Sequence, residues 1–102
     1  MHITAIGSDG PGKQELDPSV LEKADVTVCD SYEQCRRLGE LQQAALPRER
    51  VLELGELTSG MKKGRSNENQ ISVCDLTGIG VLDSAIAEYT FSALERVAKK
   101  DL

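Results

Sequence analysis

The sequence predicts a three-layer α/β fold: half of a doubly wound parallel sheet, followed by a long C-terminal helix. Short apolar runs at residues 2–6, 26–29 and 71–74 each stop at turn-forming residues before a helical pattern begins. Three strand–helix units in succession imply parallel strands with right-handed crossovers. A length of 102 residues supports a single domain, residues 1–102.

The first two helices have recognisable starts. Asp17 followed by Pro18 gives an N-cap and a proline at the first helical position, which predicts a short helix through residue 24. Asp30 and Ser31 cap a second helix, interrupted at Gly39 and closed by Pro47. Its apolar positions follow a helical spacing: Tyr32, Cys35, Leu38, Leu41 and Ala45.

The third part of the chain is less regular. Residues 51–54 are compatible with a brief strand, and residues 56–59 with a turn or two of helix. Residues 62–69, KKGRSNEN, form a polar loop that is solvated or lies against a phosphate or a partner.

The last helix, residues 81–99, carries two apolar stripes. At about 100° per residue, one stripe contains Leu82, Ile86, Tyr89, Ala93 and Val97, and the other contains Ala87, Phe91, Leu94 and Ala98. One face of a sheet covers a narrower stripe than this. The second face is therefore expected to pack on another domain or a second subunit.

Composition excludes several classes of function. The net charge of -5 argues against a nucleic-acid surface and against an anionic membrane. No apolar run is long enough to span a bilayer and no signal peptide begins the chain, so a cytoplasmic location is predicted. Cys29, Cys35 and Cys74 are odd in number and lack zinc-site spacing, so we expect buried thiols and no metal site.

Residues 7–13, GSDGPGK, form a glycine-rich loop directly after the first strand. Glycine allows close approach of another body, and Pro11 stiffens the loop, so Asp9 and Lys13 are candidates for chemistry at the carboxyl end of a parallel sheet. The alternative is a solvated turn with two ordinary surface charges.

Two motifs resemble the ornithine cyclodeaminase and mu-crystallin family. Residues 6–16, IGSDGPGKQEL, resemble its A-[VI]-G-[AGS]-D-x-P-G-K-x-E-L segment, and residues 73–83, VCDLTGIGVLD, resemble V-[FC]-D-[SL]-[TV]-G-x-[AG]-x-x-D. Weaker matches lie between them, at residues 54–57 and 64–65. Members are about three times this length. The resemblance implies the C-terminal portion of such a protein, with the C-terminal half of a Rossmann-like sheet.

The resemblance implies an NAD(P)-dependent oxidoreductase or cyclodeaminase that moves hydride to or from the α-carbon of an amino or imino acid. Asp9 falls on the family's catalytic aspartate, the acid and base at the reacting nitrogen, where it also contacts the substrate. Thr77 lies against the substrate. The cofactor side is lined by Ile6, Gly7, Ser8, Lys13 and Leu76. Leu76 departs from the serine of ornithine cyclodeaminase itself and favours imine-reducing or alanine-dehydrogenase-like members.

The glycine fingerprint G-x-G-x-x-G is missing. Gly78 and Gly80 follow a strand, but Asp83 stands at the third glycine position, and its charge opposes a phosphate. The substrate-binding cations of the family are also missing from this segment. We therefore predict that the isolated chain binds no dinucleotide tightly and is inactive alone.

Three interpretations stay open. The first is a fragment or domain of such an oxidoreductase. The second is a stand-alone Rossmann-like interaction module that dimerises through its last helix. The third is a small acidic structural domain without a site. A homo-oligomer, or pairing with a missing domain, is expected for the first two.

Overall fold

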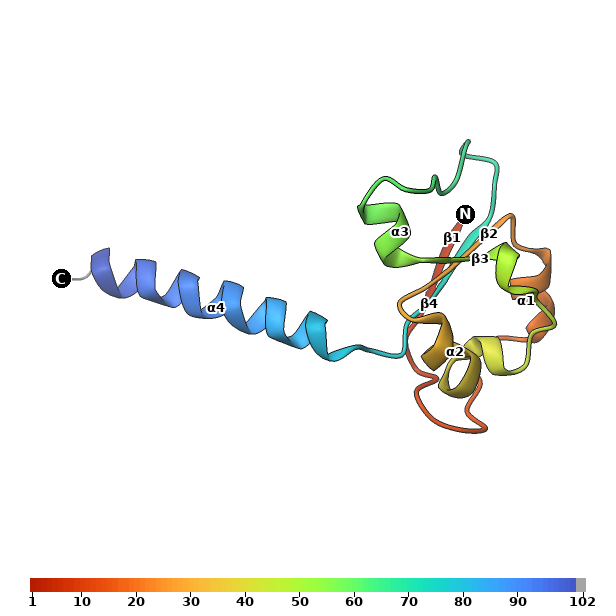
Figure 1. The fold of residues 1–102 in the computed structure, drawn as a ribbon, viewed down its shortest axis with the longest axis horizontal. Coiled ribbons are helices and arrows are strands. Elements are labelled where there is room, and N and C mark those ends of the chain that lie inside the picture. Colours follow the sequence, from red (N-terminus) through yellow and green to blue (C-terminus); the bar gives the residue numbers. More distant parts are fainter. Residues whose placement is uncertain (101–102) are drawn as a thin grey trace.

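The computed structural model describes residues 1–100, which form a four-stranded parallel sheet with helices (Figure 1). The strands are β1 (His2–Ala5), β2 (Val26–Cys29), β3 (Val51–Glu53) and β4 (Ser72–Asp75), in the order β1-β4-β2-β3. Every pairing is parallel, and Thr27 of β2 lies opposite both Val51 and Val73. The predicted α/β class is thus confirmed, and the brief strand that residues 51–54 allowed is present as β3.

The predicted start of α1 (Pro18–Lys23) is confirmed. The Asp17 carboxylate accepts a hydrogen bond from Ser19 N at 2.9 Å, which satisfies one amide of the first turn. Proline at the first helical position loses no helix hydrogen bond there.

Helix α2 (Tyr32–Leu38) is shorter than the sequence pattern indicated. Ser31 caps it, but it ends at Gly39, and Leu41 belongs to a separate 3-10 turn, η1 (Glu40–Gln42). Ala45 lies outside any helix. A second 3-10 turn, η2 (Arg48–Arg50), precedes β3, and α3 (Leu54–Thr58) follows it.

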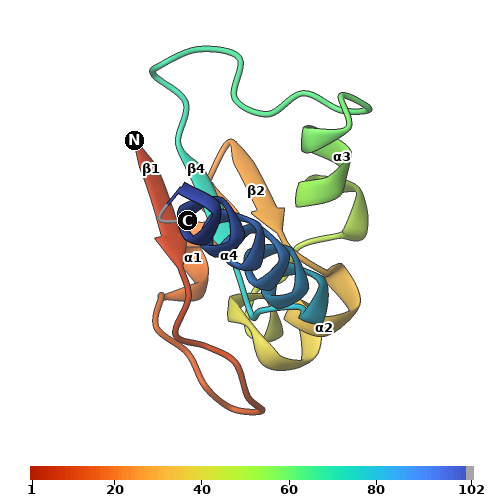
Figure 2. The same cartoon turned by 90° about the vertical axis from the view of Figure 1, so that its left-hand side faces the viewer.

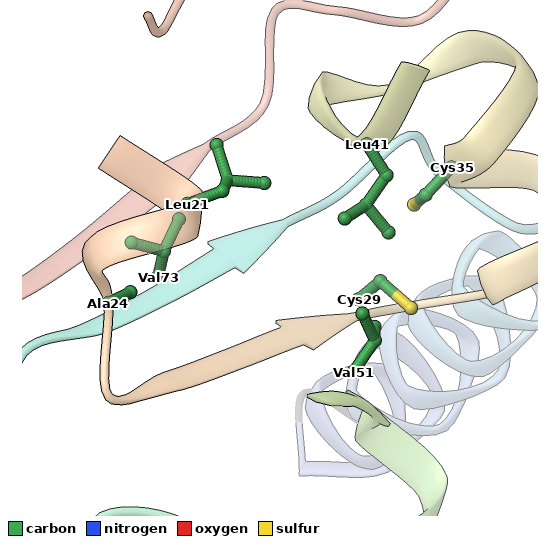
Figure 3. Packing of buried hydrophobic residues seen from close by; sticks show 7 residues of the cluster. All are labelled: Leu21, Ala24, Cys29, Cys35, Leu41, Val51 and Val73. Atoms are coloured by element: carbon green, nitrogen blue, oxygen red, sulfur yellow. The ribbon is translucent and has the colours of Figure 1, made fainter. Parts of the chain in front are cut away.

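Helices α1 and α2 and turn η1 bury their apolar side chains on one face of the sheet (Figure 3). Alternate residues of a strand point to one face, so Val73, Cys29 and Val51 share the side that meets these helices. The fully buried part of this cluster also contains Leu21 and Cys35.

Gly39 is required by close packing. A Cβ atom at this position would lie 2.5 Å from a carboxylate oxygen of Asp75, at the end of β4. We expect Gly39→Ala to lower the free energy of unfolding by about 2 kcal/mol, the cost of an overpacked interior. Urea unfolding measures this effect. Gly55→Ala in α3 is the matched control, because open space surrounds its Cβ position, and it should be neutral or stabilising.

Helix α4 (Gly80–Lys100) departs from expectation in what it contacts. It projects away from the sheet on the side opposite α1 (Figures 1 and 2). Both apolar stripes are exposed, with Ile86 and Phe91 retaining 67% and 64% of their accessible surface. The predicted packing of one stripe on the sheet is therefore wrong for these residues. No helix among residues 1–100 has the length and apolar character needed to cross a membrane.

Candidate active site

The carboxyl ends of β1, β4 and β2 meet at one edge of the sheet. Leu76 N donates to Ala5 O at 2.9 Å, so the segment after β4 begins beside the end of β1. Asp30 N donates to Asp75 O at 3.3 Å on the other side of β4. This edge therefore gathers the two motifs of the sequence, as expected for a parallel sheet.

Asp9 stands in the open loop after β1. Its carboxylate is 54% exposed and pairs with Lys13, whose Nζ lies 2.6 Å from Asp9 Oδ1. The hydrogen bond from Lys13, together with its charge, lowers the pKa of the Asp9 carboxyl below its ordinary value. Asp9 is thus a solvent-accessible carboxylate with a cationic neighbour.

The residues predicted to line the cofactor differ in exposure and in hydrogen bonding. Ile6 is 70% exposed. Ser8 is buried, and its Oγ lies 2.9 Å from Lys13 O and 3.0 Å from Leu38 O. Its hydroxyl therefore links the loop to the end of α2. Gly7 N donates to Glu15 Oε1 at 2.7 Å. The ammonium of Lys13 is engaged by Asp9.

Thr77 is held by hydrogen bonds to Asp30, at the end of β2, and to Gln34 of α2. Its backbone N donates to Asp30 Oδ2 at 3.1 Å, and its hydroxyl accepts a hydrogen bond from Gln34 Nε2 at 2.8 Å. Within residues 1–100, no hydrogen bond joins Asp9 to Leu76 or Thr77. The structure thus brings Leu76 beside the end of β1 and holds Thr77 over β2.

Asp30 organises the segment after β4, and it was absent from the predicted site. Its buried carboxylate also accepts a hydrogen bond from Gly78 N at 2.7 Å and one from the Cys35 thiol, whose Sγ is 3.1 Å away. Burial raises the pKa of Asp30, but hydrogen bonds from Cys35 and from nearby backbone amides outweigh it, and the pKa is lowered. A signal existed: the triplet Val-Cys-Asp occurs at both 28–30 and 73–75.

Asp75, the carboxylate of the second triplet, is fully buried at the end of β4. Its Oδ2 accepts a hydrogen bond from Leu41 N at 3.1 Å, while Oδ1 has no partner among the described residues. Burial raises the pKa of the Asp75 carboxyl, against the opposing backbone hydrogen bonds of Glu40 and Leu41. Asp75 is thus an interior link between β4 and turn η1.

The three cysteines are free and buried, as the sequence predicted. The interaction with Cys29, burial and the neighbouring Asp30 raise the pKa of the Cys35 thiol far above its ordinary value. A thiol in this state is a poor nucleophile. Residues 1–100 contain no group of three or more potential metal ligands.

The segment that resembled a glycine fingerprint is a turn in the structure. Gly78 has φ of +89°, in the left-handed region that favours glycine, and Gly80 begins α4. Asp83 stands in the first turn of that helix.

Comparisons with known proteins agree on one family. The model of the ornithine cyclodeaminase/mu-crystallin family matches residues 1–98. An uncharacterised cyclodeaminase of Sinorhizobium fredii is 48% identical over 99 residues, covering 92% of this chain and 30% of the relative. The iminosuccinate reductase of Paracoccus denitrificans, solved with NAD+, has a TM-score of 0.84 and 33% identity over 95% of this chain and 31% of its own. An archaeal alanine dehydrogenase dimer with bound NAD has a TM-score of 0.81 and 38% identity over 99% of this chain and 32% of its own.

The matches also define how much of a relative is present. The chain spans about 30% of the length of the curated relatives that it matches. Its structural neighbours are Rossmann-like proteins solved with NAD. Since the family model covers residues 1–98, the chain belongs to the ornithine cyclodeaminase/mu-crystallin family.

Proposed function

We propose that this chain supplies the acid–base aspartate and the nicotinamide-side loops of an NAD(P)-dependent oxidoreductase or cyclodeaminase acting on an amino acid or its imine. In this proposal residues 1–102 form part of a dinucleotide-binding domain and are inactive alone. The observation that carries the proposal is the exposed Asp9 carboxylate, on a loop that leaves the sheet edge where Leu76 joins β1.

The chemistry assigned to Asp9 follows from its charge and exposure. An amine must lose a proton before it gives up hydride, and a protonated imine is the better hydride acceptor. Asp9 takes a proton from the first and returns one to the second. A substrate ammonium would replace Lys13 as the partner of Asp9, because both are cations that donate hydrogen bonds.

The residues fit one end of the dinucleotide and not the other. When bound, the nicotinamide supplies or accepts the hydride. The exposed Ile6 and the adjoining Leu76 offer apolar surface to a flat ring, with Thr77 on the substrate side. For the phosphates the described residues offer no glycine fingerprint, and Lys13 is already paired.

We therefore expect the isolated chain to bind NAD+ no more tightly than millimolar. Isothermal titration calorimetry with NAD+ and NADH measures this affinity. Micromolar binding would mean that the chain holds a phosphate site of its own, contrary to the proposal.

The activity is tested in a chimera. Residues 1–102 replace the corresponding third of the archaeal alanine dehydrogenase, which 99% of this chain superposes on. The chimera should reduce NAD+ in the presence of L-alanine, whereas the host lacking that third should not. A chimera that folds and binds NAD+ but shows no turnover contradicts the proposal.

A second candidate rests on α4. Seven large apolar side chains of this helix are exposed in the isolated chain: Val81, Leu82, Ile86, Tyr89, Phe91, Leu94 and Val97. An interaction module that dimerises through α4 would bury them. Size-exclusion chromatography with light scattering separates the candidates: a monodisperse dimer supports the module, and an unstable monomer or soluble aggregate supports the oxidoreductase part.

A further inference from the structure

The loop that carries Asp9 has little backbone–backbone hydrogen bonding of its own. Between residues 6 and 16, the only backbone–backbone hydrogen bond inside the loop joins Lys13 N to Gly10 O at 3.2 Å. The loop contains no helix or strand. Hydrogen bonds made by side chains also lie within the loop and join Gly7 to Glu15, Ser8 to Lys13 and Lys13 to Asp9. Further backbone groups of the loop bind residues 39–42, here named the clamp turn.

Glu40 of the clamp turn anchors the far end of the loop. Glu40 is 1% exposed. Its Oε1 accepts a hydrogen bond from Glu15 N at 2.7 Å, and its Oε2 accepts one from Leu16 N at 3.1 Å. No lysine or arginine of the described residues lies within salt-bridge distance of it. A buried carboxylate is costly unless hydrogen-bonded, so these two amides hold the loop and satisfy Glu40 together.

Gln42 of the clamp turn holds the loop directly after Asp9, from Gly10 to Lys13. Its Oε1 accepts a hydrogen bond from Gly12 N at 2.9 Å, and its Nε2 donates to Gly10 O at 3.1 Å and Lys13 O at 3.2 Å. Gly10 directly follows Asp9, and Lys13 is the residue whose ammonium binds its carboxylate. One amide side chain thus binds the backbone that joins Asp9 to Lys13 and the backbone of Lys13 itself.

The clamp turn also contacts β4. Asp75, which precedes Leu76 and Thr77, accepts a hydrogen bond from Leu41 N at 3.1 Å. The same four residues therefore hold the loop after β1 and the end of β4, the two segments that carry the family motifs.

We infer that Gln42 and Glu40 are positioning residues, which set where the Asp9 carboxylate stands relative to the segment after β4. The inference rests on the proposed function, in which Asp9 exchanges a proton with the reacting nitrogen of the substrate. Neither side chain is assigned contact with substrate or cofactor. They act through the backbone of residues 10–16.

The first test uses the 102-residue chain and NMR. In Gln42→Ala the Asp9–Lys13 pair should loosen, so the pKa of Asp9 moves up toward its ordinary value. The amide of Gly12 should lose protection from hydrogen exchange, because it loses its acceptor. Sheet amides such as that of Val73 should stay protected. Gln70→Ala is the matched control, since Gln70 Oε1 holds a different loop through Ser66 N at 2.7 Å. An unchanged Asp9 pKa and unchanged loop protection in Gln42→Ala would overturn the inference.

The second test uses the alanine dehydrogenase chimera. Misplacing a reacting group by about 1 Å can cost about 100-fold in rate. Gln42→Ala should lower kcat by about this factor while the KM for NAD+ stays within about twofold. Glu40→Gln, which keeps the shape of Glu40, should act in the same direction.

The two tests separate the inference from the proposed function. If Asp9→Asn leaves the chimera active, the proposed function fails, yet the NMR result still decides whether the clamp turn holds the loop. If Asp9→Asn removes activity while Gln42→Ala changes neither the pKa of Asp9 nor kcat, the positioning inference fails alone.

Discussion

Asp9→Asn in the alanine dehydrogenase chimera is expected to lower kcat by about 100-fold to 10,000-fold, the range for loss of a positioned acid–base group. Asparagine keeps the size of the side chain and can still accept a hydrogen bond from Lys13, so the loop should retain its shape. It cannot take up or return a proton at the reacting nitrogen. Steady-state rates of alanine-dependent NAD+ reduction measure the loss.

The matched control is Asp17→Asn, at the end of the same loop. Asp17 is also exposed, and asparagine caps a helix about as well as aspartate, so turnover should be unchanged. Equal rates for Asp9→Asn and the unmodified chimera would support the third interpretation, a structural domain without a site.

Lys13 adds an independent check through pH. Its hydrogen bond and charge lower the pKa of Asp9 in the free chain, so Lys13→Gln should raise that pKa and move the acidic limb of the kcat/KM profile to higher pH. A limb that stays in place would mean that a group other than Asp9 sets it.

The fold was predictable to the extent that local signals specify it. The cap at Asp17, the proline after it and the apolar run at 26–29 placed α1 and β2 correctly. The interruption of the second helix at Gly39 was also predicted, and α2 ends there. The need for glycine at this position was not predictable, because it comes from the carboxylate of Asp75, 36 residues away. The contacts of α4 could not be predicted from the sequence either. An apolar stripe indicates that a helix face is buried, but it does not specify which surface covers that face.

Part of the candidate site was likewise predictable from local motifs, and part was not. The motifs identified the loop of Asp9 and the segment of Leu76 and Thr77, and the sheet brings these two segments to one edge. Asp30 and the clamp turn were missed. Glu40 and Gln42 meet their partners 24 to 32 residues away in the chain, and no local spacing encodes such contacts.

Asp30→Ala is expected to lower the free energy of unfolding at pH 7 by about 4 kcal/mol, the largest stability effect that we predict for the chain. The carboxylate accepts hydrogen bonds from the backbone amides of Ser31, Thr77 and Gly78. A hydrogen bond to a charged group contributes about 1.5 to 3 kcal/mol. Removing the carboxylate leaves the last two amides without this acceptor. Urea unfolding followed by circular dichroism measures the difference.

Asp25→Ala is the matched control, because Asp25 precedes the same strand that Asp30 follows. Its carboxylate accepts one amide, Ile71 N at 2.7 Å, and it is exposed, so water can replace it. The cost of Asp25→Ala should therefore be clearly smaller. Equal costs for the two variants would mean that Asp30 does not organise the segment after β4.

The pH dependence of the Asp30 effect has a definite sign. The pKa of Asp30 in the folded chain lies below its ordinary value of 3.8, so the unfolded chain binds the proton more tightly. The stabilisation is fully present above 3.8 and is lost as the pH falls through the lower folded-state pKa. The free-energy difference between the wild-type chain and Asp30→Ala should thus be constant from pH 7 to 5 and shrink below pH 4. A difference that grows on acidification would mean that burial, which opposes the charged form, outweighs the hydrogen bonds from Cys35 and the amides.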